Sequence, residues 1–238
     1  MSGTTGDKNL VLSLRNVGFS YRRKGAGHDR TYWALKDVSF DLHHGEALGV
    51  IGRNGAGKST LLRLMAGITR PDRGTLVNNG YTASLLSLQV GFVPYLTGRK
   101  NAILSSLLLG LKYTEVEEKM LSIIKFAELG DFIDQPIATY SSGMKARLGF
   151  SVAFHADPDV LLIDEVLGVG DADFKEKSTA VMKEKIRSDK TVVMVSHSAS
   201  TIQELCTRAV WIEDGVTRAD GEPASVLKEY QSCIRKSA

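Results

Sequence analysis

The sequence predicts an α/β fold: a mostly parallel β-sheet with an N-terminal antiparallel β subdomain and an inserted helical subdomain. A glycine-rich segment at residues 52–60 lies between an apolar, strand-like segment and an apolar, helix-like one. The continuous apolar runs at 160–163 and 192–195 are typical of strands buried in a parallel sheet. Between these features the pattern becomes helical. We therefore expect residues 1–238 to form one α/β domain with a helical subdomain at approximately 89–150.

The segments that precede the glycine-rich loop predict strands. Residues 11–21 alternate in polarity and predict a strand, a basic loop follows at 22–30, and residues 34–42 predict a second strand. A proline- and glycine-containing turn at 70–74 ends the helix that follows the loop, and 75–88 again has a strand pattern. The strands before the loop are expected to form a small antiparallel sheet.

The inserted region contains the clearest helix signals. Thr114-Glu115-Val116-Glu117 fits a capping box, and Gly130 is expected to stop the helix that follows. Apolar residues recur between them at helical spacing, and we interpret this stripe as core. Its members are Val116, Met120, Ile123 and Ala127.

The C-terminal part predicts a hairpin and a helix. Residues 209–212 and Val216 flank the turn Glu213-Asp214-Gly215. Residues 224–234 form an amphipathic pattern whose apolar face is expected to pack on the core. That face comprises Val226, Leu227, Tyr230 and Ile234.

Composition narrows the class of protein. The content is 43% hydrophobic and 24% charged, as in ordinary globular proteins, and the net charge of +3 argues against a dedicated nucleic-acid binder. The two cysteines, Cys206 and Cys233, lack metal-ligand spacing. The polar N-terminus shows no signal peptide, and the most apolar run, 102–111, is too short to span a bilayer. We expect a cytosolic protein that reaches a membrane only by docking onto another protein.

The segment Gly-Arg-Asn-Gly-Ala-Gly-Lys-Ser-Thr at 52–60 fits G-x-x-x-x-G-K-[ST], the P-loop. Unpaired backbone N–H groups and the helix dipole both favour phosphate at such a turn. Lys58 is expected to reach the β- and γ-phosphates of a nucleotide, and Ser59 to hold Mg²⁺. The expected nucleotide-binding residues here are Gly52, Asn54, Gly55, Ala56, Gly57, Lys58, Ser59 and Thr60.

Two further segments point to the same chemistry. The apolar strand at 160–163 ends in Asp164 and Glu165, at the edge of a parallel sheet where ligands bind. Asp164 can hold the water shell of the metal, and Glu165 can act as general base toward an attacking water. The segment 140–147, Tyr-Ser-Ser-Gly-Met-Lys-Ala-Arg, opens a helix with small polar residues and forms a second candidate anion site.

The order of these segments resembles that of an ABC-type ATPase. The P-loop, Tyr140 to Met144, Val160 to Glu165, and Ser196-His197 follow one another as in that family. The resemblance implies a RecA-like core that binds ATP and Mg²⁺, and a head-to-tail homodimer that sandwiches two ATP molecules. In such a dimer the signature segment of one subunit caps the γ-phosphate held by the other. Ser141, Ser142 and Gly143 occupy that segment here.

The resemblance assigns three further roles. His197 matches the switch histidine that contacts the γ-phosphate, and Asp171, with Gly170, matches the loop that crosses the dimer interface. An aromatic residue stacks on adenine in the family. Tyr21 is our first choice for it, with Tyr32 or Trp33 as alternatives, and Trp33 could instead be a core residue.

Finer details resemble the ATPase subunits of bacterial polysaccharide exporters, which move O-antigen, capsule or teichoic-acid chains across the inner membrane. They are Tyr-Ser-Ser-Gly-Met at 140–144, the run from Asp164 to Phe174, Leu-Thr-Gly-Arg at 96–99 and the segment 33–40. This resemblance implies two polytopic permease subunits as partners and a peripheral location on the cytoplasmic face of that membrane. The complex, rather than this chain, would handle the polysaccharide. Because few residues follow Trp211, we expect no separate domain here that recognises the polymer end.

The chain also departs from the family pattern. The usual glutamine that reaches Mg²⁺ would fall at Val93 or Pro94, and Gln89 is the nearest glutamine. Arg99-Lys100-Asn101 replaces a common Arg-Glu-Asn, which reverses a charge. The alternatives are a soluble ABC-type ATPase acting on nucleic acid or the ribosome, an ABC ATPase for a non-polysaccharide substrate, and a nucleotide-gated module without turnover. The retained Glu165 argues against the last of these.

Overall fold

The computed structural model describes residues 9–23, 30–86, 91–165 and 168–237. The chain divides into two compact units. Unit 1 comprises Met1–Leu85, Asp159–Glu165 and Lys185–Ala238, and unit 2 comprises Leu86–Pro158 and Val166–Glu184.

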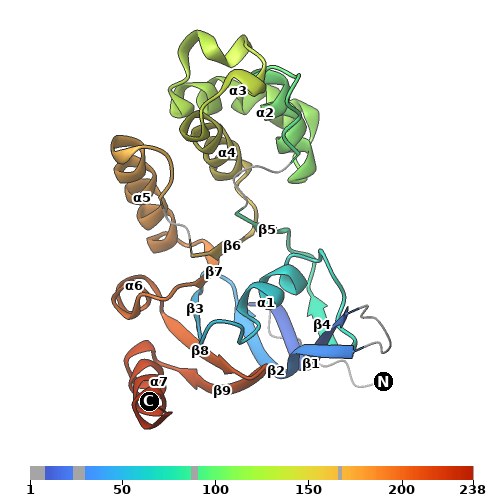
Figure 1. Cartoon of the computed structure of the whole chain (residues 1–238), viewed down its shortest axis with the longest axis vertical. Coiled ribbons are helices and arrows are strands. Elements are labelled where there is room, and N and C mark those ends of the chain that lie inside the picture. The colour runs from blue at the N-terminus through green and yellow to red at the C-terminus, as the bar shows by residue number, and fades with distance from the viewer. Residues whose placement is uncertain (1–8, 24–29, 87–90, 166–167, 238) are drawn as a thin grey trace. The chain divides into compact units, whose positions relative to one another are not determined.

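Unit 1 is built on one nine-stranded sheet with the order β4-β1-β2-β9-β8-β3-β7-β6-β5 (Figure 1). Strand β3 pairs in parallel with β7 and β8, and β6 pairs in parallel with β5 and β7. The predicted α/β class is therefore confirmed. The strands are β1 Leu10–Arg23, β2 Arg30–His43, β3 Ala47–Ile51, β4 Arg73–Asn78, β5 Ala83–Leu85, β6 Val160–Asp164, β7 Thr191–Val195, β8 Arg208–Glu213 and β9 Val216–Gly221.

Three neighbouring parallel strands, β3, β7 and β6, are buried because of their apolar composition. All five residues of β3 and of β7 are buried, as are the first four of β6, because both faces of a parallel sheet are covered. Helix α1, Lys58–Met65, packs Leu61, Leu62 and Leu64 into the core on this sheet. The apolar runs of the sequence thus form the buried, parallel part of the sheet that contains the P-loop strand.

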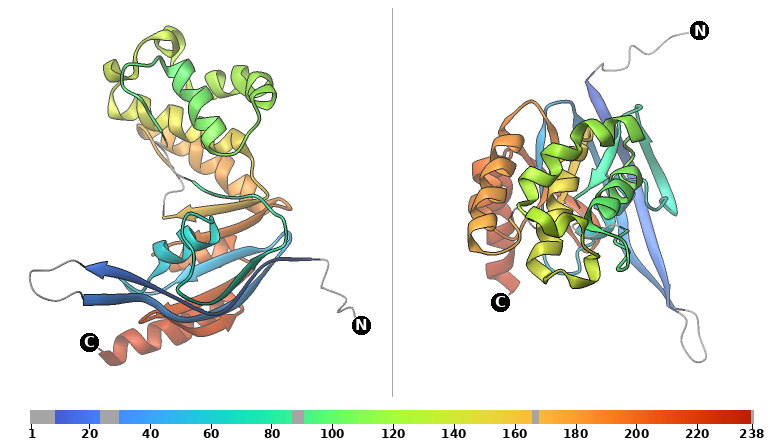
Figure 2. Two further views of the ribbon diagram at one scale, coloured as in Figure 1. Left: turned by 90° about the vertical axis from the view of Figure 1, so that its right-hand side faces the viewer. Right: turned by 90° about the horizontal axis from the view of Figure 1, so that it is seen from above.

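The antiparallel part of the sheet is also confirmed, with longer strands than predicted. Strand β1 pairs with β2 and with β4, and a single parallel pairing, Asp37 with Val216, joins β2 to β9. Figure 2 shows β1 and β2 as long neighbouring ribbons. The predicted strand pattern at 75–88 is divided, because Asn78 Oδ1 accepts hydrogen bonds from the backbone N–H of Gly80 and Tyr81 and turns the chain.

The C-terminal elements of unit 1 match the prediction in outline. The β8–β9 turn uses Asp214 and Gly215 with φ of 53° and 75°, and helix α6, Ala199–Leu205, follows β7. Helix α7 spans Pro223–Ser237, and its Val226 and Leu227 are buried. The predicted packing of Ile234 is wrong, since 36% of this residue is exposed at the far end of the helix.

Unit 2 is helical, and the region expected at 89–150 lies within it. Its helices are α2 Gly98–Leu108, α3 Tyr113–Ala127, α4 Ser142–Ala156 and most of α5 Ala172–Arg187, with short 3₁₀ turns at Gly130–Asp134 and Ile137–Thr139. The predicted stripe on α3 forms a core with residues of α2 and α4. This core includes Ala102, Val116, Met120, Ile123, Ala127, Leu148 and Val152.

The ends of α3 differ from those predicted. The helix begins at Tyr113 after Lys112, whose backbone N–H donates to Glu115 Oε2 at 2.6 Å. Glu115 therefore fills the acceptor role expected of Glu117. The helix ends at Ala127, because Glu128 takes a left-handed φ of 53° before Gly130 is reached.

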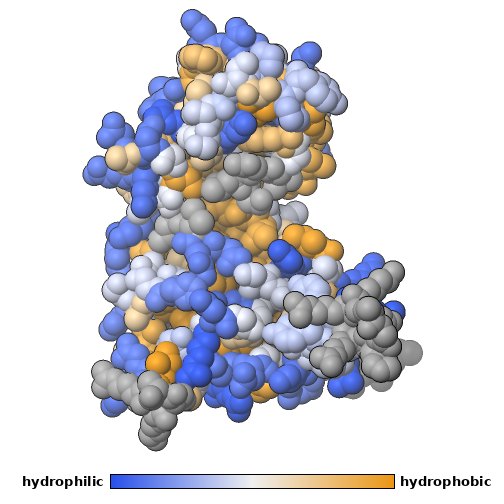
Figure 3. Space-filling view, in the orientation of Figure 1, coloured by the Kyte–Doolittle hydropathy of each residue, from blue (hydrophilic) through white to orange (hydrophobic). Residues whose placement is uncertain are grey.

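Hydrophilic residues occupy much of the face drawn in Figure 3, and apolar residues form smaller patches on it. Within the described part of the chain, none of the helices combines the length and the apolarity needed to cross a membrane.

Candidate functional site

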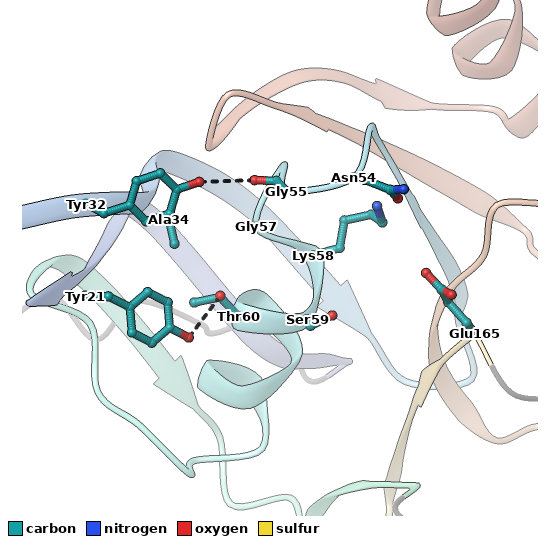
Figure 4. Close-up of a pocket in the computed structure, with 10 residues that line it drawn as sticks. All are labelled: Tyr21, Tyr32, Ala34, Asn54, Gly55, Gly57, Lys58, Ser59, Thr60 and Glu165. Carbon is teal, nitrogen blue, oxygen red and sulfur yellow. Dashed lines mark hydrogen bonds between the residues drawn. The ribbon is translucent and has the colours of Figure 1, made fainter. Parts of the chain in front are cut away.

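A pocket of about 400 Å³ in unit 1 gathers the P-loop, the facing ends of β1 and β2, and the end of β6 (Figure 4). Its polar and apolar surfaces are mixed, and it is open to solvent. The lining residues are Tyr21, Tyr32, Ala34, Asn54, Gly55, Gly57, Lys58, Ser59, Thr60 and Glu165.

The shape of the loop depends on glycine. Strand β3 ends at Ile51 and α1 begins at Lys58, so the loop between them consists of residues 52–57. Gly57 has φ of 102°, and a Cβ there would lie 2.5 Å from the carbonyl oxygen of Ala34. A side chain at this position would push the first turn of α1 away from β2. Gly57 is therefore required for packing as well as for phosphate access.

Lys58 is buried within this loop. Its Nζ donates to the carbonyl oxygens of Gly52 at 2.9 Å and Arg53 at 3.0 Å. Burial lowers the pKa of Lys58, while the nearby carboxylates of Glu165 and Asp164 act in the opposite direction. The ammonium group is thus held at the loop, between backbone carbonyls and the acidic end of β6.

The acidic end of β6 contains a pair of residues from two strands. Glu165 follows β6 with a left-handed φ of 66°, and its backbone N–H donates to the carbonyl oxygen of Val195 at 3.0 Å. His197 follows β7, and its Nε2 lies 2.5 Å from Glu165 Oε1. Both side chains are about half exposed, at 48% each. The sequence proposed a role for each residue but did not predict that they pair.

The oxygen donors near the loop fit Mg²⁺. The hydroxyl of Ser59 lines the pocket, and Asp164 ends β6 directly before Glu165. Mg²⁺ is usually bound by one or two such groups together with substrate phosphates and water. No group of three His, Cys, Asp or Glu gathers among the residues that the structure describes. Gln89, the third expected metal ligand, lies outside the described residues.

The three aromatic candidates for adenine stacking are placed differently. Tyr21 and Tyr32 lie opposite each other on β1 and β2 and both line the pocket. Tyr21 Oη lies 3.2 Å from Thr60 Oγ1, whereas 54% of Tyr32 is exposed. Trp33 does not line the pocket, and its ring lies 4.1 Å from the guanidinium of Arg73. The geometry favours a tyrosine, and stacking by Tyr21 stays a prediction.

The segment expected to act as the signature belongs to unit 2. Ser141 is the N-cap of α4, and its Oγ accepts from the backbone N–H of Met144 at 3.1 Å. Ser141, Gly143 and Asp171 line one hollow of about 580 Å³, and Ser142 is not among its lining residues. The structure therefore brings three of the four residues expected to act on a second subunit's ATP to one place.

Asn101 is a residue whose role the sequence did not reveal. It is fully buried, its Oδ1 accepts from the backbone N–H of Val93 at 2.7 Å, and its Nδ2 donates to the carbonyl oxygens of Val93, Leu96 and Thr97 at 3.0–3.1 Å. It thereby holds the loop that contains Val93 and Pro94. An asparagine, a residue of low intrinsic helix propensity, near the start of a helix is the sequence signal that could have identified it.

The pattern of the ABC transporter family matches residues 35–168. The O-antigen export system ATP-binding protein RfbB of Klebsiella pneumoniae is 47% identical over 205 residues, which cover 86% of this chain and 83% of that protein. The teichoic acids export ATP-binding protein TagH of Listeria innocua is 46% identical over 241 residues, covering 96% and 72%. RfbB of Myxococcus xanthus is 47% identical over 201 residues, which make up only 46% of its length.

Solved structures show the same fold. An ATP-binding subunit of an ABC transporter superposes with a TM-score of 0.72 at 22% identity, covering 93% of each chain. A dimeric ATP-binding cassette bound to ADP and Pi superposes with a TM-score of 0.70 at 22% identity, covering 89% of this chain and 98% of that one.

Proposed function

Because this chain belongs to the ABC transporter family, we propose that it is the ATP-hydrolysing subunit of an exporter that moves a polysaccharide across the inner membrane. The polysaccharide would be O-antigen, capsular or teichoic-acid-like. The observation that carries the proposal is the meeting of Lys58 and Glu165 in one pocket beside the P-loop. The export substrate is inferred from the relatives named for O-antigen and teichoic-acid export.

Binding of ATP uses the loop and the start of α1. Backbone N–H groups of the loop and the dipole of α1 favour the phosphates, and the Lys58 ammonium would exchange its carbonyl partners for the β- and γ-phosphates. Ser59 and Asp164 would hold the Mg²⁺ that neutralises phosphate charge. Gln89 is proposed as a further Mg²⁺ ligand because it is the glutamine nearest to the usual position in the sequence.

Hydrolysis uses the pair at the ends of β6 and β7. Glu165 accepts a proton from the attacking water, the water oxygen bonds to the γ-phosphorus, and the bond to the β–γ bridging oxygen breaks to give ADP and phosphate. His197, 2.5 Å from Glu165, holds the carboxylate in place and can reach the γ-phosphate. Its position beside the base supports this double role.

The proposed function also requires this chain to assemble with a second copy of itself and with membrane subunits. Ser141, Ser142, Gly143 and Asp171 of one subunit would act on ATP held by the other, so that turnover needs a homodimer. Two polytopic permease subunits would bind this dimer at the cytoplasmic face of the membrane. The permeases, not this chain, would contact the polysaccharide.

The test combines a cellular and a biochemical readout. Deletion of the gene in the native host should remove the surface polysaccharide, and wild-type protein should restore it while Glu165→Gln should not. Both forms should co-purify with one polytopic protein from detergent-solubilised membranes. Co-purification with ribosomes or nucleic acid, or normal surface polysaccharide in the deletion strain, would contradict the proposal.

A further inference from the structure

Arg147 lies at the centre of a charged cluster in unit 2, outside the pocket that holds Lys58. Its guanidinium forms ion pairs with Asp171 and, at 3.6 Å, with Glu128, and it lies 5.2 Å from the ring of Phe174. The side chain of Arg147 is 20% exposed, whereas those of Asp171 and Glu128 are about half exposed. One side chain of α4 therefore joins the end of α3 to the loop before α5.

That loop is also anchored to α5. Asp171 Oδ1 accepts from the backbone N–H of Phe174 at 3.1 Å, and the backbone N–H of Val169 donates at 3.1 Å to the fully buried Ser178 Oγ. The hydrogen bond from Arg147 is the main cause of the lowered pKa of Asp171. Two hydrogen bonds thus attach residues 169–171 to α5, and Arg147 links Asp171 to the helix that Ser141 caps.

We infer that Arg147 is a positioning residue that joins the loop at Asp171 to the signature segment at the start of α4. The inference rests on the proposed function, in which both segments approach the ATP of a second subunit. The planar fork of arginine can serve two carboxylates at once, which a lysine ammonium does less well. If Arg147 is removed, Asp171 loses this cation while Glu128 keeps its ion pair with Lys177, and the two segments can move independently.

Mixed dimers can test this role with a single active site. One chain carries Lys58→Ala and cannot bind ATP tightly, and the other carries Gly143→Asp and has a blocked signature segment. Neither homodimer should hydrolyse ATP. The mixed dimer keeps one composite site, made from the P-loop of the Gly143→Asp chain and the signature segment of the Lys58→Ala chain.

Arg147→Ala is then placed in one chain or in the other. In the Lys58→Ala chain, whose signature segment works, it should lower the ATPase rate about 10- to 100-fold, because a displacement of roughly 1 Å can have such an effect. In the Gly143→Asp chain, whose signature segment is already blocked, it should leave the rate unchanged. Arg147→Lys in the first position should give an intermediate rate, and it provides the same comparison if Arg147→Ala does not fold.

Lys177→Gln is the matched control. Lys177 pairs with Glu128 at 2.6 Å and lies 4.3 Å from the ring of Phe126, and its ion pair is with Glu128 rather than with Asp171. Its substitution in the Lys58→Ala chain should leave the rate within about 2-fold, with thermal unfolding showing that each variant is folded.

Three outcomes would overturn the inference. Equal losses in both placements would show that Arg147 only stabilises the fold. Unchanged rates in both placements would show that the contact has no role in turnover. A parent mixed dimer that forms but is inactive would contradict the proposed trans arrangement itself, which separates that failure from a failure of Arg147.

Discussion

Lys58 shows how the structure adds to a motif at the scale of one residue. The motif identifies the lysine, but only the fold shows that its ammonium lies on the carbonyl oxygens of Gly52 and Arg53. A buried ammonium with neutral partners is readily transferred to a phosphate, because the phosphate supplies the charge that the loop carbonyls lack. The fold therefore already places the Lys58 ammonium at the loop where a phosphate would bind.

The separate roles of Lys58 and Glu165 lead to the first prediction. Lys58→Ala should abolish tight ATP binding, since the phosphates lose their buried cation. Glu165→Gln should keep ATP binding and lower the turnover rate about 10²–10⁴-fold, the usual effect of losing a general base. Nucleotide-binding and steady-state ATPase assays on both variants would check this. Wild-type turnover by Glu165→Gln would contradict the assigned base.

The contact between His197 and Glu165 leads to the second. His197→Ala should lower kcat by roughly 10- to 100-fold with a smaller effect on KM, because an orienting contact matters most in the transition state. Steady-state kinetics would show the split, with His44→Ala as the control because the His44 ring lies 6.3 Å from the ring of Tyr81, whereas His197 contacts Glu165. A rise in KM with unchanged kcat would instead indicate a role in substrate binding alone.

At the scale of elements, a pair of side-chain hydrogen bonds attaches the turn after α1 to strand β1. Asp72, in the turn after α1, accepts at 2.7 Å from the backbone N–H of Ser20 and at 2.8 Å from its Oγ, and so attaches this turn to β1. These bonds favour the ionised carboxylate and lower the pKa of Asp72. The contact joins the P-loop helix to the strand that carries Tyr21.

The third prediction concerns the pH dependence of this contact. Because the pKa of Asp72 is lower in the folded than in the unfolded chain, the contribution to stability is present above about pH 4 and is lost as the pH falls through the folded pKa. Asp72→Asn should therefore reduce stability at pH 7 and weaken its dependence on acid pH. Urea unfolding of both forms at several pH values would measure this, and identical slopes would refute it.

At the scale of the whole molecule, the expected catalytic parts are divided between the two units. Lys58, Ser59, Glu165 and His197 belong to unit 1, whereas Ser141, Gly143 and Asp171 belong to unit 2. Under the proposed function the second group completes the site of another copy. Two copies of the chain should therefore form a dimer when ATP is bound and cannot be hydrolysed.

This leads to the fourth prediction. Glu165→Gln should elute as a dimer in size-exclusion chromatography with Mg²⁺ and ATP, because each ATP would be held by both subunits and persists when the base is absent. The double variant Lys58→Ala, Glu165→Gln should remain monomeric under the same conditions. A monomeric Glu165→Gln variant that binds ATP would contradict the sandwich arrangement.

The helix signals of the sequence are sufficient to predict that α3 and α7 exist, but not to predict the residues at which they begin and end or which side chains they bury. The apolar stripe of α3 is buried as predicted, since helical spacing alone sets which residues share a face. The start of α3 was misplaced because Glu115 and Glu117 both fit an acceptor position, and only the backbone geometry at Lys112 selects Glu115. Ile234 was assigned to the core because periodicity cannot show where the neighbouring elements end.

The α/β class, the P-loop and the acidic end of β6 can be predicted from the amino-acid pattern, because each depends on residues that are adjacent in the chain. Three contacts emerge only in the folded chain: His197 with Glu165, the two tyrosines at the pocket, and Arg147 with Asp171. The first of these contacts follows from the register of β6 and β7, which sets Asp164 opposite Val195. Strand register and helix packing depend on contacts between residues that are far apart in the chain, so a local sequence pattern does not specify them.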